Sequence, residues 1–203
     1  MAGKLQGIVR SFLDEVSRGN FEIYNEFSLQ HEIGCFIRDA FAKLKLPFKV
    51  QFERPSEFFG ISKNKLEKKE IDIVIFNEAE RAAIELKFPR NGQYPEQMFK
   101  ACQDIRFLEQ LCDLGFDLGI FLMVVDDSGF YSSHKQSTEG IYSYFRKARP
   151  LRGTIRKPTG KKDKTITLRG EYQITWYSLG GIENKRQLKY ALVSVLPNKT
   201  KSN

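Results

Sequence analysis

Polar and apolar side chains follow two distinct periods along this chain, and these periods divide it into helices and strands. Residues 5–18 and 29–46 carry apolar side chains at the spacing of amphipathic helices. Ser28 is the expected N-cap of the second helix, and Pro47 marks its end. Residues 48–53 alternate strictly between apolar and polar side chains, which predicts a half-buried strand.

The centre of the chain predicts a hairpin followed by a parallel crossover. Residues 71–76 and 82–88 are rich in apolar and β-branched side chains and flank a turn at 77–80. A helical stripe covers residues 95–114, and residues 118–125 form an almost uninterrupted apolar run, typical of a strand buried on both faces. A strand, a helix and a strand of these lengths predict a parallel strand pair.

The C-terminal third predicts further short elements. They are a helix at 140–148, hairpin arms at 154–157 and 164–168, and strands at 172–179 and 189–196. Residues 62–70 are strongly charged instead and predict an exposed loop.

Length and composition favour one domain over residues 1–203. With 203 residues, of which 41% are hydrophobic, the chain can build one sizeable core. It contains no apolar run long enough to span a membrane, and its first residues lack the pattern of a signal peptide. These features predict an intracellular, cytoplasmic protein without a membrane partner.

Cysteine and histidine are too few for several kinds of site. Cys35, Cys102 and Cys112 are odd in number and are expected to be reduced thiols. His31 and His134 are the only histidines, which argues against a zinc site, a His-dependent nuclease and a Ser-His-Asp hydrolase. Any metal ion would therefore be held by carboxylates.

The positive charge is concentrated in one segment. The chain has 33 basic and 25 acidic residues, and ten of the basic residues lie between Arg146 and Arg169 with a single acid. Such a segment can be merely solvated or can dock on an acidic protein, but its density and the aromatic residues directly before it favour nucleic acid. The candidate contacts are Arg152, Arg156, Lys157, Lys161, Lys162 and Lys164.

Three charged residues in the central hairpin are candidates for chemistry. Glu85 and Lys87 share one face of their strand, because side chains alternate, and Asp72 can lie beside them on the preceding strand. The pair alone is more typical of an ordinary solvent-facing strand. With Asp72, however, the set offers two carboxylates for Mg²⁺ and an ammonium to position or deprotonate water or to neutralise charge on a phosphate.

The order of these residues and elements resembles the PD-(D/E)XK nuclease superfamily. Asp72 precedes Glu85-Leu86-Lys87 by a dozen residues, a helix bearing Glu32 comes before, and a helix and a buried strand follow. The resemblance covers residues 28–126. It implies an α/β fold with a restriction-endonuclease-like α-β-β-β-α-β core and a mixed sheet, to which the basic, β-rich hairpin region at about 146–170 would be added.

The resemblance also implies roles for individual residues. Asp72 and Glu85 would be the metal-binding acids, the carbonyl of Leu86 a further ligand, Lys87 the catalytic lysine and Glu32 the additional acid on the helix. The cofactor would be Mg²⁺, with Mn²⁺ as a substitute.

The resulting hypothesis is a metal-dependent DNA endonuclease that hydrolyses phosphodiester bonds in restriction, repair or recombination. Because restriction enzymes usually cut two strands as dimers, the resemblance also suggests a homodimer. Two alternatives stay open. One is a catalytically silent nuclease-fold module that binds nucleic acid, and the other is a protein-interaction domain with an acidic partner.

Overall fold

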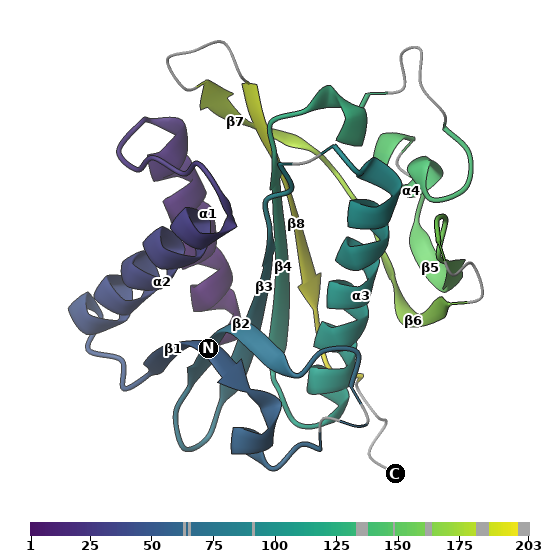
Figure 1. Ribbon diagram of the computed structural model, residues 1–203. Helices are drawn as coiled ribbons and strands as arrows, with labels where there is room; N and C mark the ends of the chain where they lie inside the picture. Colours follow the sequence, from purple (N-terminus) through teal and green to yellow (C-terminus); the bar gives the residue numbers. More distant parts are fainter. Residues whose placement is uncertain are drawn as a thin grey trace.

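The fold is built from four α-helices and eight strands within the part of the chain that the computed structural model describes (Figure 1). The described residues are 1–62, 64, 66–90, 92–132, 138–147, 149–160, 164–181 and 187–198. The helices are α1 (Ala2–Ser17), α2 (Glu26–Lys43), α3 (Tyr94–Asp113) and α4 (Tyr142–Arg146), with short 3₁₀ turns η1 (Ser56–Phe59) and η3 (Ser128–Phe130). The strands are β1 (Lys49–Pro55), β2 (Glu70–Phe76), β3 (Arg81–Lys87), β4 (Leu118–Val125), β5 (Leu151–Arg156), β6 (Thr165–Tyr172), β7 (Tyr177–Gly181) and β8 (Gln187–Val195).

Six of the strands form one mixed sheet in the order β1-β2-β3-β4-β8-β7. The β2–β3 pair is an antiparallel hairpin, and β3 pairs with β4 in parallel after the α3 crossover. Every other pair in this sheet is antiparallel. The predicted α/β class, central hairpin and parallel crossover are therefore confirmed.

Helices cover both faces of the sheet (Figure 1). Helices α1 and α2 pack on one face, where alternate side chains of β2, β3 and β4 meet them in one buried apolar cluster. Helix α3 packs on the other face, against the remaining alternate side chains of the same strands. Because β4 is covered on both sides, all its side chains are buried, as its apolar run predicts. Within the described residues, no helix combines the length and apolar character needed to cross a membrane.

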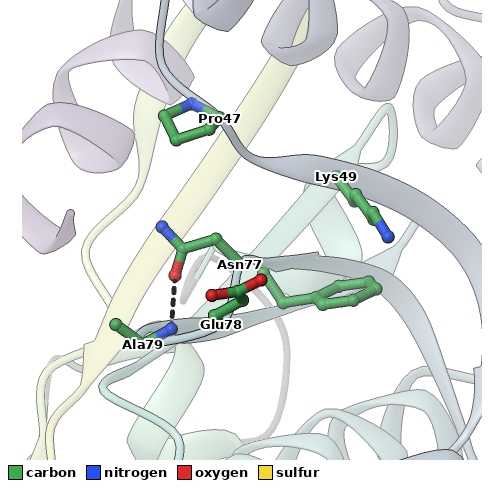
Figure 2. A pocket seen from close by; sticks show the side chains of 6 residues that line it. Pro47, Lys49, Asn77, Glu78 and Ala79 are labelled. Atoms are coloured by element: carbon green, nitrogen blue, oxygen red, sulfur yellow. Dashed lines mark hydrogen bonds between the residues drawn. The ribbon is translucent and has the colours of Figure 1, made fainter.

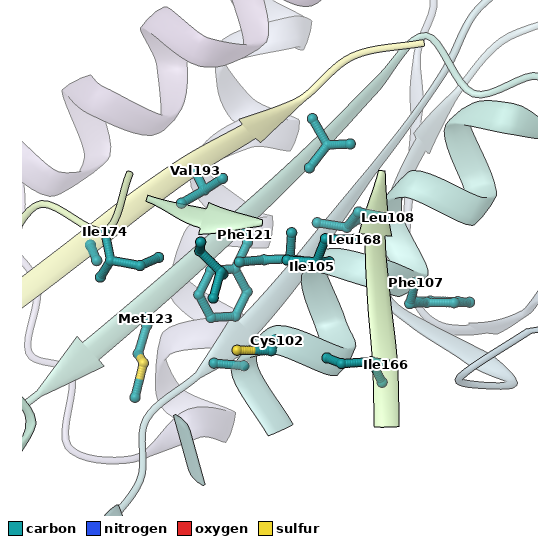
Figure 3. Packing of buried hydrophobic residues seen from close by; sticks show 14 of the residues in the cluster. Cys102, Ile105, Phe107, Leu108, Phe121, Met123, Ile166, Leu168, Ile174 and Val193 are labelled. Carbon is teal, nitrogen blue, oxygen red and sulfur yellow. The ribbon is translucent and has the colours of Figure 1, made fainter. Parts of the chain in front are cut away.

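The remaining two strands, β5 and β6, form a separate hairpin on the outer side of α3. Ile166 and Leu168 of β6 belong to the same buried cluster as Ile105 and Leu108 of α3 and Phe121 of β4 (Figure 3). The basic segment is therefore anchored to the helix that covers the sheet.

Several boundaries differ from the sequence-based expectation, and two of them concern the start of α2 and the strand expected at 172–179. The N-cap of α2 is Asn25, and Ser28 is the N3 residue that completes a capping box, because each side chain bonds the other residue's backbone amide. The expected strand 172–179 is divided, since Tyr172 ends β6 and Tyr177 begins β7. Between them, Trp176 Nε1 donates to the carbonyl of Phe145 at 2.8 Å.

The three cysteines are free thiols, as predicted. Cys102 and Cys112 lie on α3 in the apolar cluster, where burial raises the pKa of the Cys112 thiol to about 12.

A buried carboxylate fixes the hairpin to α3. Glu109 is fully buried, and its oxygens accept hydrogen bonds from the amides of Arg169 (3.0 Å) and Gly170 (2.7 Å) and from the hydroxyl of Tyr172 (2.9 Å). Arg106 adds an ion pair at 3.0 Å. Such a carboxylate is stable only while these partners are present, because burial removes its water.

Removing this carboxylate should destabilise the protein strongly. We expect Glu109→Ala to lower the free energy of unfolding by about 3–5 kcal/mol, because two amides, a hydroxyl and a guanidinium lose their acceptor. Glu171→Ala is the matched control on the same strand, since its exposed ion pair with Arg152 is worth less than about 1 kcal/mol. Urea unfolding followed by circular dichroism measures both values, and equal losses would contradict this role.

Candidate active site

The backbone pairing of the sheet is interrupted at Asp72, and we call this interruption the opening of the sheet. Pairing between β2 and β3 ends at Ile73 and Ile84, so Asp72 and Glu85, the next residues of the two strands, face each other without a backbone ladder. The pairing between β1 and β2 also skips Asp72, since it includes Ile71 and Ile73 but not the residue between them. On that side the opposite residue is Glu53, whose φ of 46° lies in the left-handed region that non-glycine residues rarely adopt.

Side chains replace the missing ladder bonds at this opening. The amide of Asp72 donates to Oε1 of Glu85 at 3.3 Å, and the amide of Leu86 donates to Oδ2 of Asp72 at 2.7 Å. The carbonyl of Asp72 accepts from Nε2 of Gln30 on α2 at 2.8 Å. The two carboxylates are therefore held in place by the backbone of the opposite strand.

A third carboxylate and a second lysine complete the cluster. Asp104 projects from α3, and Lys68 projects from the irregular segment before β2. The ammonium of Lys68 lies 3.2 Å from Oδ1 of Asp72 and 3.3 Å from Oδ1 of Asp104, and it also contacts Oε2 of Glu85. Three carboxylates from three elements thus converge on one ammonium group.

Lys87 lies at the other side of Asp104. Its Nζ is 3.1 Å from Oδ2 of Asp104 and donates to the carbonyl of Leu86 at 3.1 Å. Glu26 of α2 reaches the same ammonium at 3.8 Å, while its second oxygen accepts from the amide of Phe88. Helices from both faces of the sheet therefore contribute acids around Lys87.

The cluster holds one carboxylate more than ammonium groups, and burial makes that excess costly. Burial, with the nearby charge of Asp72, raises the pKa of Glu85 despite the contact with Lys68. Burial also raises the pKa of Asp104 against the pull of both lysines. Burial opposes the charged form of Lys68, but the carboxylates around it outweigh that effect and raise its pKa.

The structure brings together most of the residues that the resemblance implies, but not Glu32. Asp72, Glu85, Leu86 and Lys87 meet at the opening of the sheet. Glu32 does not join them, since its carboxylate lies 3.2 Å from Nδ1 of the exposed His31.

The position of Glu32 follows from the phase of α2. Glu26 and Gln30 are one helical turn apart and point toward the sheet, whereas Glu32 is two residues further and lies on another face. Glu26 is therefore the acid of α2 that contacts Lys87 in this structure, whereas Glu32 contacts His31.

Lys68 and Asp104 were missed by the sequence analysis. Lys68 falls in the charged stretch expected to be an exposed loop, yet only 27% of its side chain is exposed, which corrects that expectation. Asp104 is buried on the apolar side of α3. An acid within the apolar stripe of a helix is the signal that could have identified it, because a buried carboxylate needs a partner.

The basic segment is less free than its charge suggests. Arg152 pairs with Glu171 at 2.9 Å, and Lys157 pairs with Glu96 at 3.0 Å. Arg156 and Lys164 are exposed. Lys161 and Lys162 lie outside the described residues.

Further arginines of this segment serve the fold. Arg146 donates to the carbonyl of Gly129 and stacks on the ring of Tyr142, and Arg169 pairs with Asp113.

Several pockets lie away from the carboxylate cluster, and two of them are relevant here. One, of about 600 Å³, lies at the β2–β3 turn, at the opposite end of these strands, and is lined by Pro47, Lys49, Phe76, Asn77, Glu78 and Ala79 (Figure 2). The other, of about 570 Å³, lies on the hairpin and is lined partly by Arg149, Arg152 and Tyr144. The guanidinium of Arg149 is 5.3 Å from the centroid of the Tyr144 ring, so this pocket combines positive charge with an aromatic surface.

The donor set suits a hard cation, but its present spacing suits an ammonium. Within the described ranges, no group of three or more His, Cys, Asp or Glu side chains is arranged to hold a metal ion. The oxygens of Asp72 and Asp104 lie 3.2–3.3 Å from Lys68 Nζ, whereas Mg²⁺ binds oxygens at about 2.1 Å. Oδ2 of Asp104 is buried and lies 3.1 Å from the ammonium of Lys87, while Oδ1 lies 3.3 Å from Lys68, so both oxygens of this carboxylate already face a cation.

Comparison with known proteins identifies no relative of this chain. Searches against protein-family models, curated proteins and solved structures find no match for this chain.

Proposed function

We propose that this chain is a metal-dependent endonuclease of PD-(D/E)XK type that hydrolyses phosphodiester bonds in DNA. The observation that carries the proposal is the convergence of Asp72, Glu85 and Lys87 at the opening of the sheet. Paired carboxylates beside an ammonium suit phosphodiester hydrolysis, since they provide both metal ligands and a positive charge for the phosphate.

The order of elements supports the same proposal. From α2 to β4 the chain runs helix, three strands, helix, strand, and the parallel pair is β3–β4. This order supports the proposal, because the resemblance implies an α-β-β-β-α-β succession with Asp72 on one strand and Glu85 and Lys87 on the next.

Each residue at the site has a role in the proposed reaction. Asp72, Glu85 and the carbonyl of Leu86 would hold Mg²⁺, which polarises a phosphate and activates water when bound. Lys87 would place its ammonium beside the phosphate, where Asp104 and Glu26 orient it. Gln30 keeps the backbone of Asp72 in position from α2.

The β5–β6 hairpin would hold the DNA backbone. Arg156 and Lys164 are exposed on it, and the pocket with Arg149 and Tyr144 offers a guanidinium and an aromatic ring together. Basic side chains bind phosphates without reading sequence, and aromatic rings stack on bases.

A specific observation favours a second candidate, a catalytically silent module that keeps this fold and binds nucleic acid. Lys68 already neutralises the carboxylates that a metal would need. Such a module would bind DNA through the hairpin without cleaving it.

Cleavage assays distinguish the two candidates. With Mg²⁺ or Mn²⁺ and plasmid or linear DNA, we expect wild-type protein to cleave and Asp72→Ala or Lys87→Ala to lose at least about a hundredfold in rate. Chelator should abolish cleavage by the wild type. Folded variants that cut as fast as wild type would refute the proposed mechanism, and an inactive wild type that still binds DNA would support the silent module.

The two helix acids give a second test of the site. Glu26→Gln should lower the cleavage rate more than Glu32→Gln, because Glu26 contacts Lys87 whereas Glu32 contacts His31. Both substitutions remove one charge from α2, so their rates at equal metal concentration can be compared directly. The reverse order would restore Glu32 as the helix acid of the site.

DNA binding by the hairpin should depend steeply on salt. If Arg156 and Lys164 each contact a phosphate, the variant Arg156→Ala/Lys164→Ala should lower the slope of log K against log salt by about two, since each contact contributes about 0.9. Lys4→Ala/Lys43→Ala is the matched control, with two exposed lysines on α1 and α2. Filter binding measures the slopes. Equal slopes would exclude these contacts, and no retention of DNA by the wild type would favour an acidic protein partner.

A further inference from the structure

The ammonium of Lys68 occupies the point where three carboxylates converge. Asp72, Glu85 and Asp104 come from β2, β3 and α3, and each directs an oxygen toward this one nitrogen. The side chains of Glu85 and Asp104 are 0% and 4% exposed, so water contributes little to the neutralisation of these oxygens. Lys68 is therefore their principal counter-ion, together with Lys87 beside Asp104.

A divalent cation at this point would compete with Lys68. An ammonium and a metal ion cannot occupy the same position among the same oxygens, and their positive charges would repel each other strongly within this buried space. The charge balance favours the exchange. Once Lys68 moves out, Asp72, Glu85 and Asp104 carry two more negative charges than Lys87 offsets, even without the half-exposed Glu26 beside Lys87, and one divalent cation would neutralise those two.

Lys68 can move without disturbing the sheet. Its segment, residues 66–69, is neither helix nor strand, and at 27% its side chain is more exposed than those of Asp72, Glu85, Asp104 and Lys87. The backbone on either side is held, since Glu67 N donates to Gln110 at 2.9 Å and Lys69 O accepts from Ser56 at 2.9 Å. Rotation of the flexible side chain alone would carry the ammonium toward solvent.

We propose that Lys68 is a resident counter-ion that a divalent cation displaces from the cage formed by Asp72, Glu85 and Asp104. The inference rests on the proposed function, because it concerns how the same site accepts its metal ion. It adds Asp104 as a third carboxylate of the cation site and makes Lys68 an antagonist of metal binding. At low metal concentration Lys68 would offset part of the negative charge of the cage, and it would be exposed to solvent when metal is bound.

Metal affinity of position-68 variants tests the competition. We expect Lys68→Met to bind Mn²⁺ about tenfold or more tightly than wild type, because the competing charge is gone while the apolar stem remains. Lys68→Arg keeps the charge and should bind no more tightly than wild type. Lys69→Met is the matched control, since Lys69 is the exposed neighbour. Electron paramagnetic resonance of free Mn²⁺ gives each affinity.

Amine labelling of wild-type protein tests displacement without any substitution. With a limiting acylating reagent and mass spectrometry, Mn²⁺ should increase labelling of Lys68 several-fold and leave Lys69 unchanged. The increase should vanish in Asp72→Asn/Glu85→Gln, in which two of the proposed ligands lose their charge. This measurement holds even if Lys68→Met fails to fold.

The outcomes separate this inference from the proposed function. Suppose that Mn²⁺ binds wild type, that its affinity is no higher in folded Lys68→Met, and that it does not increase the labelling of Lys68. The displacement is then wrong, while the proposal of a metal-dependent nuclease stands. If Mn²⁺ binds neither wild type nor Lys68→Met, both the displacement and the metal-dependent function are wrong. Tighter binding to Lys68→Met together with uncovered Lys68 in wild type supports the displacement, whether or not DNA is cleaved.

Discussion

The ion cluster at the opening of the sheet constrains the rest of this structure. Buried carboxylates are tolerated only beside positive charge or hydrogen-bond donors, so Asp72, Glu85 and Asp104 require Lys68 and Lys87 at close range. These residues come from β2, β3, α3 and the segment before β2, which must therefore meet in one arrangement. The apolar clusters on both faces of the sheet supply most of the burial, and the charged groups add the requirement that these elements meet with their carboxylates and ammonium groups in contact.

The interruption of strand pairing is what makes room for this cluster. A continuous ladder would satisfy the backbone of Asp72 through β1 and β3. Here Gln30 and Glu85 do so instead, and the carboxylate of Asp72 is free to reach Leu86. The left-handed conformation of Glu53 opposite Asp72 belongs to the same distortion.

The elements were predictable because their signals are local, whereas half of the cluster depends on tertiary contacts. Alternation along β2 and β3 and the short turn between them suffice to place Asp72 opposite Glu85. Nothing local indicates that Lys68 turns inward, because its neighbours in sequence are equally charged. The rotation of α2 about its own axis determines whether Glu26 or Glu32 points toward the sheet. The apolar stripe in the sequence does not define that rotation closely enough to choose between them. Charge counting likewise overlooked that Arg146 and Arg169 are engaged within the fold.

Helix α3 couples the hairpin to the ion cluster. Asp104 faces the sheet and Glu109 faces the hairpin, five residues apart and therefore on different sides of the helix. A polyanion attracted by the exposed basic side chains of the hairpin would meet a cluster with excess negative charge on the other side of α3. That charge would repel a phosphate unless a cation joined the cluster, because like charges repel each other strongly at close range in a buried site. If the proposed function holds, a divalent ion would therefore have to join the cluster before a phosphate could approach it.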